Sequence, residues 1–176
     1  MVKKFVSVLC FLGILCLQVA AFATDKAVTV VYYAQGGGTP MIADSWYQDV
    51  SGFVNGKLGS FGITADSVDI PWAEFAEKYA GKTVNKEVAH AEWIRTLRAR
   101  YNVSVNVYVD RFFVGKDGSV DVDVNIAVIR PGEFENVLAH GNVKIEKVKG
   151  KPSIEVLQEA LSQALEQCKP GLQSTI

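Results

Sequence analysis

Three stretches in the second half of the chain alternate between apolar and polar residues. Valine occupies every second position from 103 to 109, and apolar or small residues do the same from 120 to 128 and from 137 to 145. A period of two is typical of strands that have one buried and one solvated face. Lys116-Asp117-Gly118 and Arg130-Pro131-Gly132 lie between these stretches and indicate reversals of the chain. The pattern therefore predicts a three-stranded antiparallel meander.

Two earlier stretches predict further strands: Ala27 to Tyr33 is rich in β-branched and aromatic residues, and Ile63 to Ile70 alternates weakly. Apolar residues at helical spacing predict four helices. The helices are expected from Pro40 to about Gly59, from Pro71 to a stop at Gly81, from Asn85 to Arg100, and from Ser153 to a stop at Pro170.

The last two helices differ in how they are expected to meet the core. In the helix from Asn85, the residues expected to face the core are Val84, Val88, Ala91, Ile94 or Arg95, and Leu97. In the last helix a continuous apolar stripe is expected to dock on the sheet, formed by Ile154, Leu157, Ala160, Leu161, Ala164, Leu165 and Cys168.

The resulting order of elements is β-α-β-α-α-β-β-β-α. It predicts an α+β fold whose mixed sheet ends in the antiparallel meander, with helices packed on one face and polar residues on at least part of the other. Residues 24–176 have a length that suits one domain.

The N-terminus has the three parts of a secretory signal peptide. Lys3 and Lys4 precede an apolar stretch, and Ala21-Phe22-Ala23 forms an A-x-A cleavage site. We expect residues 1–23 to be removed, which places the protein in the periplasm or outside the cell. No transmembrane helix is expected after cleavage; the alternative is an uncleaved N-terminal anchor. Cys168 would then be the single remaining cysteine, so no disulfide is expected within the chain.

Charge gives no indication of a nucleic-acid or anionic-membrane partner. Two of the 18 basic residues and none of the 19 acidic ones lie in the predicted signal peptide, so the remaining chain has a net charge of −3. Binding of nucleic acid is typical of strongly basic surfaces, which this balance does not suggest.

Motifs for catalysis or metal binding are incomplete. Glu87 and His90 form an E-x-x-H pair, but di-metal sites on helices need a second such pair and two further glutamates. Asp117, Asp121 and Asp123 lack the spacing of a calcium loop. We therefore predict no enzyme activity, no catalytic or metal-binding residue and no cofactor.

Two surfaces are candidates for binding. The loop Gln35, Gly36, Gly37, Gly38 and Thr39 joins a strand to a helix, where free backbone N–H groups can hold an anion. The polar positions of the meander form the second candidate, a face for a protein partner. Its residues are Asn106, Tyr108, Asp121, Asp123, His140 and Asn142.

The order of elements resembles that of the TolB N-terminal domain, the curli-secretion CsgG type and the lipoprotein activators of penicillin-binding proteins. The shared part starts with a strand such as 27–33 and includes a helix end, 97–102, that leads directly into three meander strands. The chain lacks the processing cysteine of the lipoprotein members. This resemblance implies a non-catalytic adaptor of the bacterial cell envelope with a protein partner, and it leaves self-association open. The alternative is a small-ligand-binding protein or hydrolase that uses Gly36–Gly38.

Overall fold

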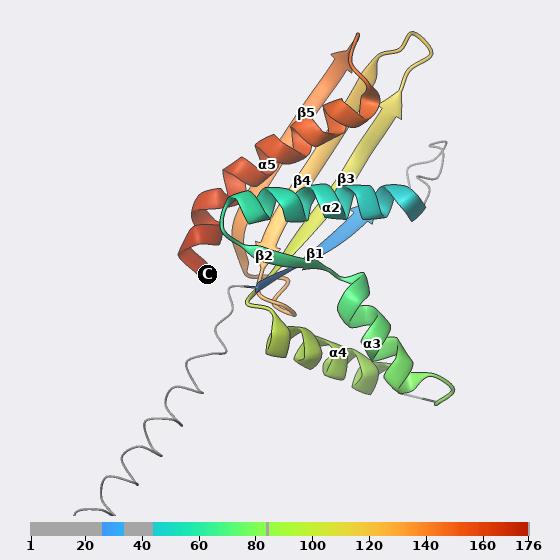
Figure 1. Cartoon of the computed structure of the whole chain (residues 1–176), viewed down its shortest axis with the longest axis vertical. Coiled ribbons are helices and arrows are strands. Elements are labelled where there is room, and N and C mark those ends of the chain that lie inside the picture. Colours follow the sequence, from blue (N-terminus) through green and yellow to red (C-terminus); the bar gives the residue numbers. More distant parts are fainter. Residues whose placement is uncertain (1–25, 34–43, 84, 176) are drawn as a thin grey trace, which may run out of the picture.

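A five-stranded sheet forms the centre of the molecule (Figure 1). The computed structural model describes residues 26–33, 44–83 and 85–175; the predicted signal peptide and the loop Gln35–Thr39 lie outside the described residues. The elements are β1 (Lys26–Tyr33), α2 (Asp44–Ser60), β2 (Thr64–Ser67), α3 (Asp69–Tyr79), α4 (Lys86–Arg100), β3 (Val103–Val114), β4 (Val120–Ile129), β5 (Val137–Val148) and α5 (Ser153–Thr175).

The sheet has the strand order β2-β1-β3-β4-β5. β1 is parallel to both β2 and β3, whereas β3, β4 and β5 pair antiparallel in sequence order. Parallel strands require long crossover connections: α2 connects the neighbours β1 and β2, and the α3–α4 pair connects β2 to β3 across β1. The predicted α+β class, the element order and the antiparallel meander are confirmed.

The main core lies between the sheet and two helices, α2 and α5, which cross one face in front of the strands in Figure 1. The valines that alternate along β3 and β4 point into this core and are almost fully buried, as the sequence predicts. The apolar stripe of α5 packs against them. The largest fully buried side chains in this layer include Leu58, Val105, Val107, Ile126, Leu157, Leu161, Leu165 and Leu172.

Two glycines allow α5 to approach β5 closely. A Cβ atom on Gly141 would overlap the carbonyl group of Ala164 and lie 3.1 Å from the Sγ atom of Cys168. A Cβ atom on Gly171 would lie 2.5 Å from that of Ala139. These positions need glycine because the helix and strand backbones meet there, not because of a special backbone angle.

The predicted end of the last helix at Pro170 is wrong, since α5 continues to Thr175. Proline removes one N–H donor and disfavours a helix interior. Here the last turn is held by tertiary packing, because Leu172 is fully buried. The hydroxyls of Ser174 and Thr175 also donate to the carbonyl oxygen of Gly171.

α4 also differs from the prediction. Val88 is 59% exposed and Ala91 is exposed, whereas Leu97 is buried as expected; Val84 lies outside the described residues. α4 packs against α3, where Trp93 meets the Trp72 ring edge-on at 5.3 Å. The C-terminal end of α4 then reaches the sheet face opposite α2 and α5. It forms a small second cluster there from Val28, Leu97 and Tyr101, with Val68 and Trp93 packed against it.

Candidate binding face

We call the side of β1, β3, β4 and β5 that points away from α2 and α5 the open face. In the view of Figure 1 it lies behind the sheet. The strand registers place its side chains in rows across the strands. One row is Tyr32, Tyr108, Asn125 and Asn142; a row on one side is Val30, Asn106, Ala127 and His140; a row on the other side is Arg111, Asp123 and Lys144.

All six residues predicted for a partner surface lie on the open face, as the registers of β3, β4 and β5 show. His140 and Asn142 are exposed, and Tyr108, Asp121 and Asp123 are partly buried. Asn106 is only 2% exposed, so it contributes less surface than predicted. It lies on the interior strand β3, where the Ser104 hydroxyl donates to its Oδ1 atom at 2.8 Å.

A pair of tyrosines forms the aromatic part of the open face. The rings of Tyr32 and Tyr108 stack with their centroids 4.8 Å apart and their planes 12° from parallel. Tyr32 remains 40% exposed, and its pKa is raised by partial burial and by Tyr108. Tyr32 was not predicted to lie on this face, because the register of the parallel pair β1–β3 cannot be read from alternation within one strand.

A β-bulge brings one more carboxylate close to the predicted ones. The register of β3 against β4 shifts between Val109 and Arg111, which leaves Asp110 as the extra residue. Burial and the neighbouring carboxylate of Asp123 raise the pKa of Asp110. Among the described residues, neither Asp110 nor Asp123 has an ion-pair partner within 4 Å.

The cations near these two aspartates are bound to other acids. Arg111 contacts Asp121 at 3.0 Å, and Lys144 contacts Glu146 at 2.7 Å. In the strand register Asp123 nevertheless lies between Arg111 and Lys144, and the pKa of Lys144 is raised mainly by Glu146 and also by Asp123. The open face therefore combines two stacked aromatic rings, asparagine amides and a row of alternating charges.

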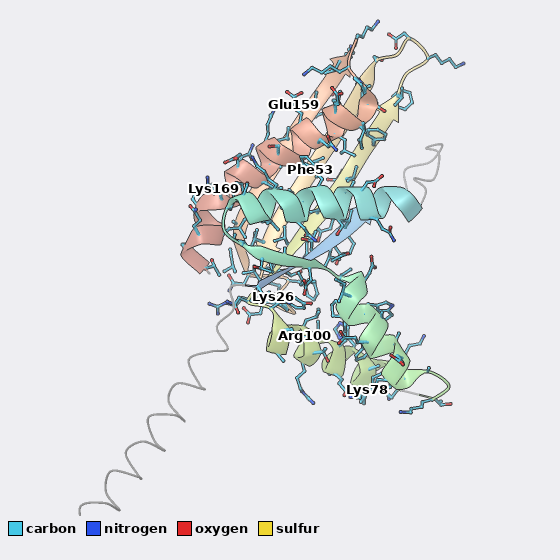
Figure 2. The ribbon with its side chains drawn as sticks, viewed as in Figure 1. Lys26, Phe53, Lys78, Arg100, Glu159 and Lys169 are labelled. Carbon is cyan, nitrogen blue, oxygen red and sulfur yellow. The ribbon has the colours of Figure 1, made fainter. Side chains whose placement is uncertain are left out.

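A polar cluster at the start of β1 connects the sheet to α4. Asp66 accepts from Lys26 at 2.8 Å and from the hydroxyl of Tyr101 at 3.0 Å. Burial opposes ionisation of Asp66, but these two bonds and the charges of Lys26 and Arg100 outweigh it and lower its pKa. Burial, with the bond to Asp66, raises the pKa of Tyr101 to about 12. Figure 2 labels Lys26 and Arg100 on the two sides of this junction.

A shallow hollow of about 340 Å³ lies between α2, β2 and the start of α3. Within the described part of the chain, the Ser51 hydroxyl is the buried polar side-chain atom without a hydrogen-bond partner. The lining residues of this hollow are Gln48, Ser51, Gly52, Asn55, Ala65, Asp66, Ser67, Asp69 and Ile70.

The residues considered for metal or thiol chemistry lie apart. Glu87 and His90 are both exposed on α4, and across residues 26–33, 44–83 and 85–175 no three His, Cys, Asp or Glu side chains gather as a metal site would require. Cys168 is fully buried, and burial raises the pKa of its thiol to about 12. In the same described ranges, no helix combines the length and apolar character needed to cross a membrane.

No family model and no curated protein matches the chain. Solved structures share its fold. Two structures of the PelC dodecamer from Paraburkholderia phytofirmans, one of them a point variant, are each 13% identical to the chain. They superpose with TM-scores of 0.54 and 0.52, over 85% and 82% of this chain and 89% and 86% of theirs.

The hypothetical protein CT253 from Chlamydia trachomatis is 10% identical, with a TM-score of 0.43 over 86% of this chain and 95% of that one. At these identities the likeness to PelC is one of fold. These structures are not of the TolB, CsgG or penicillin-binding-protein activator type, so that resemblance stays a prediction.

Proposed function

We propose that the protein is an exported, non-catalytic binding and assembly module of the bacterial cell envelope, and that a protein partner binds its open face. The observation that carries the proposal is the composition of that face. Tyr32 and Tyr108 are stacked and partly accessible, and in the strand register they share a row with the amides of Asn125 and Asn142. Aromatic side chains are enriched in protein interfaces.

The other surfaces of the sheet offer less to a partner. The opposite face is covered by α2 and α5. β2, at one edge, is only four residues long, and the other edge, β5, has part of its backbone bonded by Gln167 of α5. Short and covered edges are typical ways to prevent pairing with another chain. The open face is therefore the surface that supports the proposal best.

A second copy of the chain is one form that the partner can take. The PelC structures with the same fold are dodecamers. At 13% identity this supports self-association as a proposal and does not indicate how many copies assemble or which surfaces meet.

A blocking substitution tests the proposal. Asn125 lies in the middle of the open face, between Tyr108 and Asn142 in the strand register. Asn125→Arg should abolish the complex, because a long charged side chain would stand between the partner and the sheet. Gln163→Arg, on the exposed side of α5, is the matched control. The protein would be purified gently from cells that make it, and its complexes measured by size exclusion with light scattering.

The proposal requires a complex in the wild type and in Gln163→Arg that is lost in Asn125→Arg, while thermal melts show that all three proteins are folded. If the complex is lost in both variants, or is kept in both, the open face is not the specific contact surface and the proposal is contradicted. A complex whose mass is a multiple of the chain mass would identify the partner as a second copy.

A further inference from the structure

The hollow beside α2 lies where parallel strands commonly hold a ligand. It is bordered by α2, by β2 and by the start of α3, which follows the carboxyl end of β2 almost directly (Figure 1). In parallel α/β arrangements, ligands bind beyond the carboxyl ends of the strands, where a helix begins. The volume of about 340 Å³ is within the usual range for a small-molecule site. The hollow therefore has the place and the size of a ligand site.

A buried hydroxyl without a partner belongs to the lining of this hollow. Ser51 is 2% exposed, and in the part of the chain that the structure describes its Oγ atom has no hydrogen-bond partner. A buried hydroxyl is costly to leave unpaired unless a ligand or a water molecule supplies the partner. Serine has one side-chain torsion, so a small adjustment is enough for the hydroxyl to meet a ligand in the hollow.

Both helices that border the hollow offer further hydrogen-bonding groups. Val68, the N-cap residue of α3, makes no side-chain hydrogen bond, so it does not cap the first N–H groups of that helix. Gln48 and Asn55 add side-chain amides from α2. Asn55 is held in place because its Oδ1 atom accepts from the Thr29 hydroxyl at 2.6 Å.

The charge of the lining favours a neutral ligand. No Lys, Arg or His is among the described residues that line the hollow, so an anion would find no opposite charge there. The carboxylate of Asp69 accepts from the Ser67 hydroxyl at 3.3 Å and lies in the first turn of α3, where the helix dipole stabilises negative charge. The carboxylate of Asp66 is bonded by Lys26 and Tyr101. Neither acid therefore needs a cation from a ligand.

We propose that this hollow binds a small neutral molecule that carries several hydroxyl groups. A hydroxyl both donates and accepts, so it matches the serine hydroxyl and the amides of α2, the uncapped start of α3 and the carboxylate of Asp69 without adding a charge. The inference goes beyond the proposed function, because the lining residues come from α2, β2 and α3 and include none of the open face.

The probe for this inference is myo-inositol, a cyclohexane ring that carries a hydroxyl on every carbon. It would be compared with cyclohexylammonium and cyclohexanecarboxylate, which place a positive and a negative charge on the same ring. Binding to the protein purified from cells that make it would be followed by amide shifts in nuclear magnetic resonance spectra. We expect inositol to shift residues of α2, β2 and the start of α3, and the two charged rings to leave them unchanged.

Two glycines of α2 provide a matched pair of variants. Gly52 lines the hollow and Gly56 does not, and an added Cβ atom would have nothing within 4 Å at either position. Gly52→Leu should abolish inositol binding, because its side chain would fill the hollow, whereas Gly56→Leu should keep it. Ser51→Ala should weaken binding about three- to tenfold without lowering the melting temperature, because the hydroxyl that it removes has no partner in the described part of the folded protein.

An absence of inositol shifts, shifts confined to another surface, tighter binding of a charged ring, or equal loss in both leucine variants would overturn the inference. A Ser51→Ala protein that binds inositol as the wild type does, or that melts at a much lower temperature, would contradict the role of the hydroxyl. Asn125→Arg blocks the open face and should leave inositol binding unchanged. Failure of this inference and failure of the proposed function are therefore separate results.

Discussion

The side-chain amide of Gln167 bonds both backbone groups of Asn142. The N–H of Asn142 donates to Oε1 of Gln167 at 3.0 Å, and Nε2 of Gln167 donates to the carbonyl oxygen of Asn142 at 3.2 Å. β5 is an edge strand, so these backbone groups would otherwise be available to another chain. A helix side chain thus occupies the place of a sixth strand at this position.

Removing that side chain should open the edge. Gln167→Ala should lower the free energy of unfolding by about 1 kcal/mol, because two partly solvated hydrogen bonds are lost. The variant should also self-associate more as its concentration is raised, since the freed backbone groups can pair with a strand of another chain. Gln163→Ala is the control on the same helix. Sedimentation velocity at several concentrations would check this, and identical behaviour of the two variants would contradict it.

The close approach of α5 to β5 predicts a sharp difference between two glycine substitutions. Gly141→Ala should destabilise the protein by about 1–3 kcal/mol, because the new Cβ atom would overlap the backbone of Ala164. Gly56→Ala in α2 should instead stabilise it by about 0.5–1 kcal/mol, since nothing lies within 4 Å of the new atom and alanine favours helix. Urea unfolding of both variants measures the two effects. A neutral Gly141→Ala would show that α5 lies farther from β5.

The two sides of β4 should respond differently to substitution. Val124→Asp buries an unpaired charge at a position that is 0% exposed and should cost several kcal/mol. Asp123→Ala should change stability by no more than about 0.5 kcal/mol, because Asp123 has no ion pair in the described part of the chain. Asp121→Ala should cost about 1 kcal/mol, because Asp121 accepts from Arg111 and from the N–H of Lys147. Thermal melts with a chelator present would rank the three variants.

Much of this fold follows from local pattern. Alternation predicts the buried faces of β3 and β4, and the apolar stripe predicts how α5 docks, because both depend on periods within one element. The pattern fails where contacts between elements decide. The pairing of Tyr32 with Tyr108 depends on a parallel register, the bulge at Asp110 on how two strands fit, and the continuation past Pro170 on the burial of Leu172. Trp93 was missed because α4 packs on α3 and not along the sheet.

Alkaline pH should destabilise the fold through two buried groups. Burial raises the pKa of Cys168 from 9 to about 12, and burial with the bond to Asp66 raises the pKa of Tyr101 from 10 to about 12. When folding raises the pKa of an acid such as a thiol or a phenol, its contribution to stability is complete at a pH below its pKa in the unfolded chain. That contribution is lost as the pH rises toward its pKa in the folded protein. Stability should therefore fall between about pH 9 and 12. Cys168→Ala should flatten that fall in urea titrations; an unchanged slope would contradict the role of the thiol.

Native Cys168 should also resist thiol reagents. Its side chain is 0% exposed, and the thiolate that reacts is disfavoured by the same burial. Labelling should be slow in buffer and fast in denaturant, as measured by the absorbance of the group that the reagent releases. Rapid labelling of the folded protein would mean that the C-terminal part of α5 opens readily.

Site-specific photocrosslinking in cells tests the central claim, binding at the open face, most directly. A photoreactive residue at Asn142 on the open face would be compared with one at Glu159 on the exposed side of α5, which Figure 2 labels. The account predicts a discrete adduct of one mass from position 142 and none from position 159. Adducts from position 159 alone, or equal yields from both positions, would contradict it.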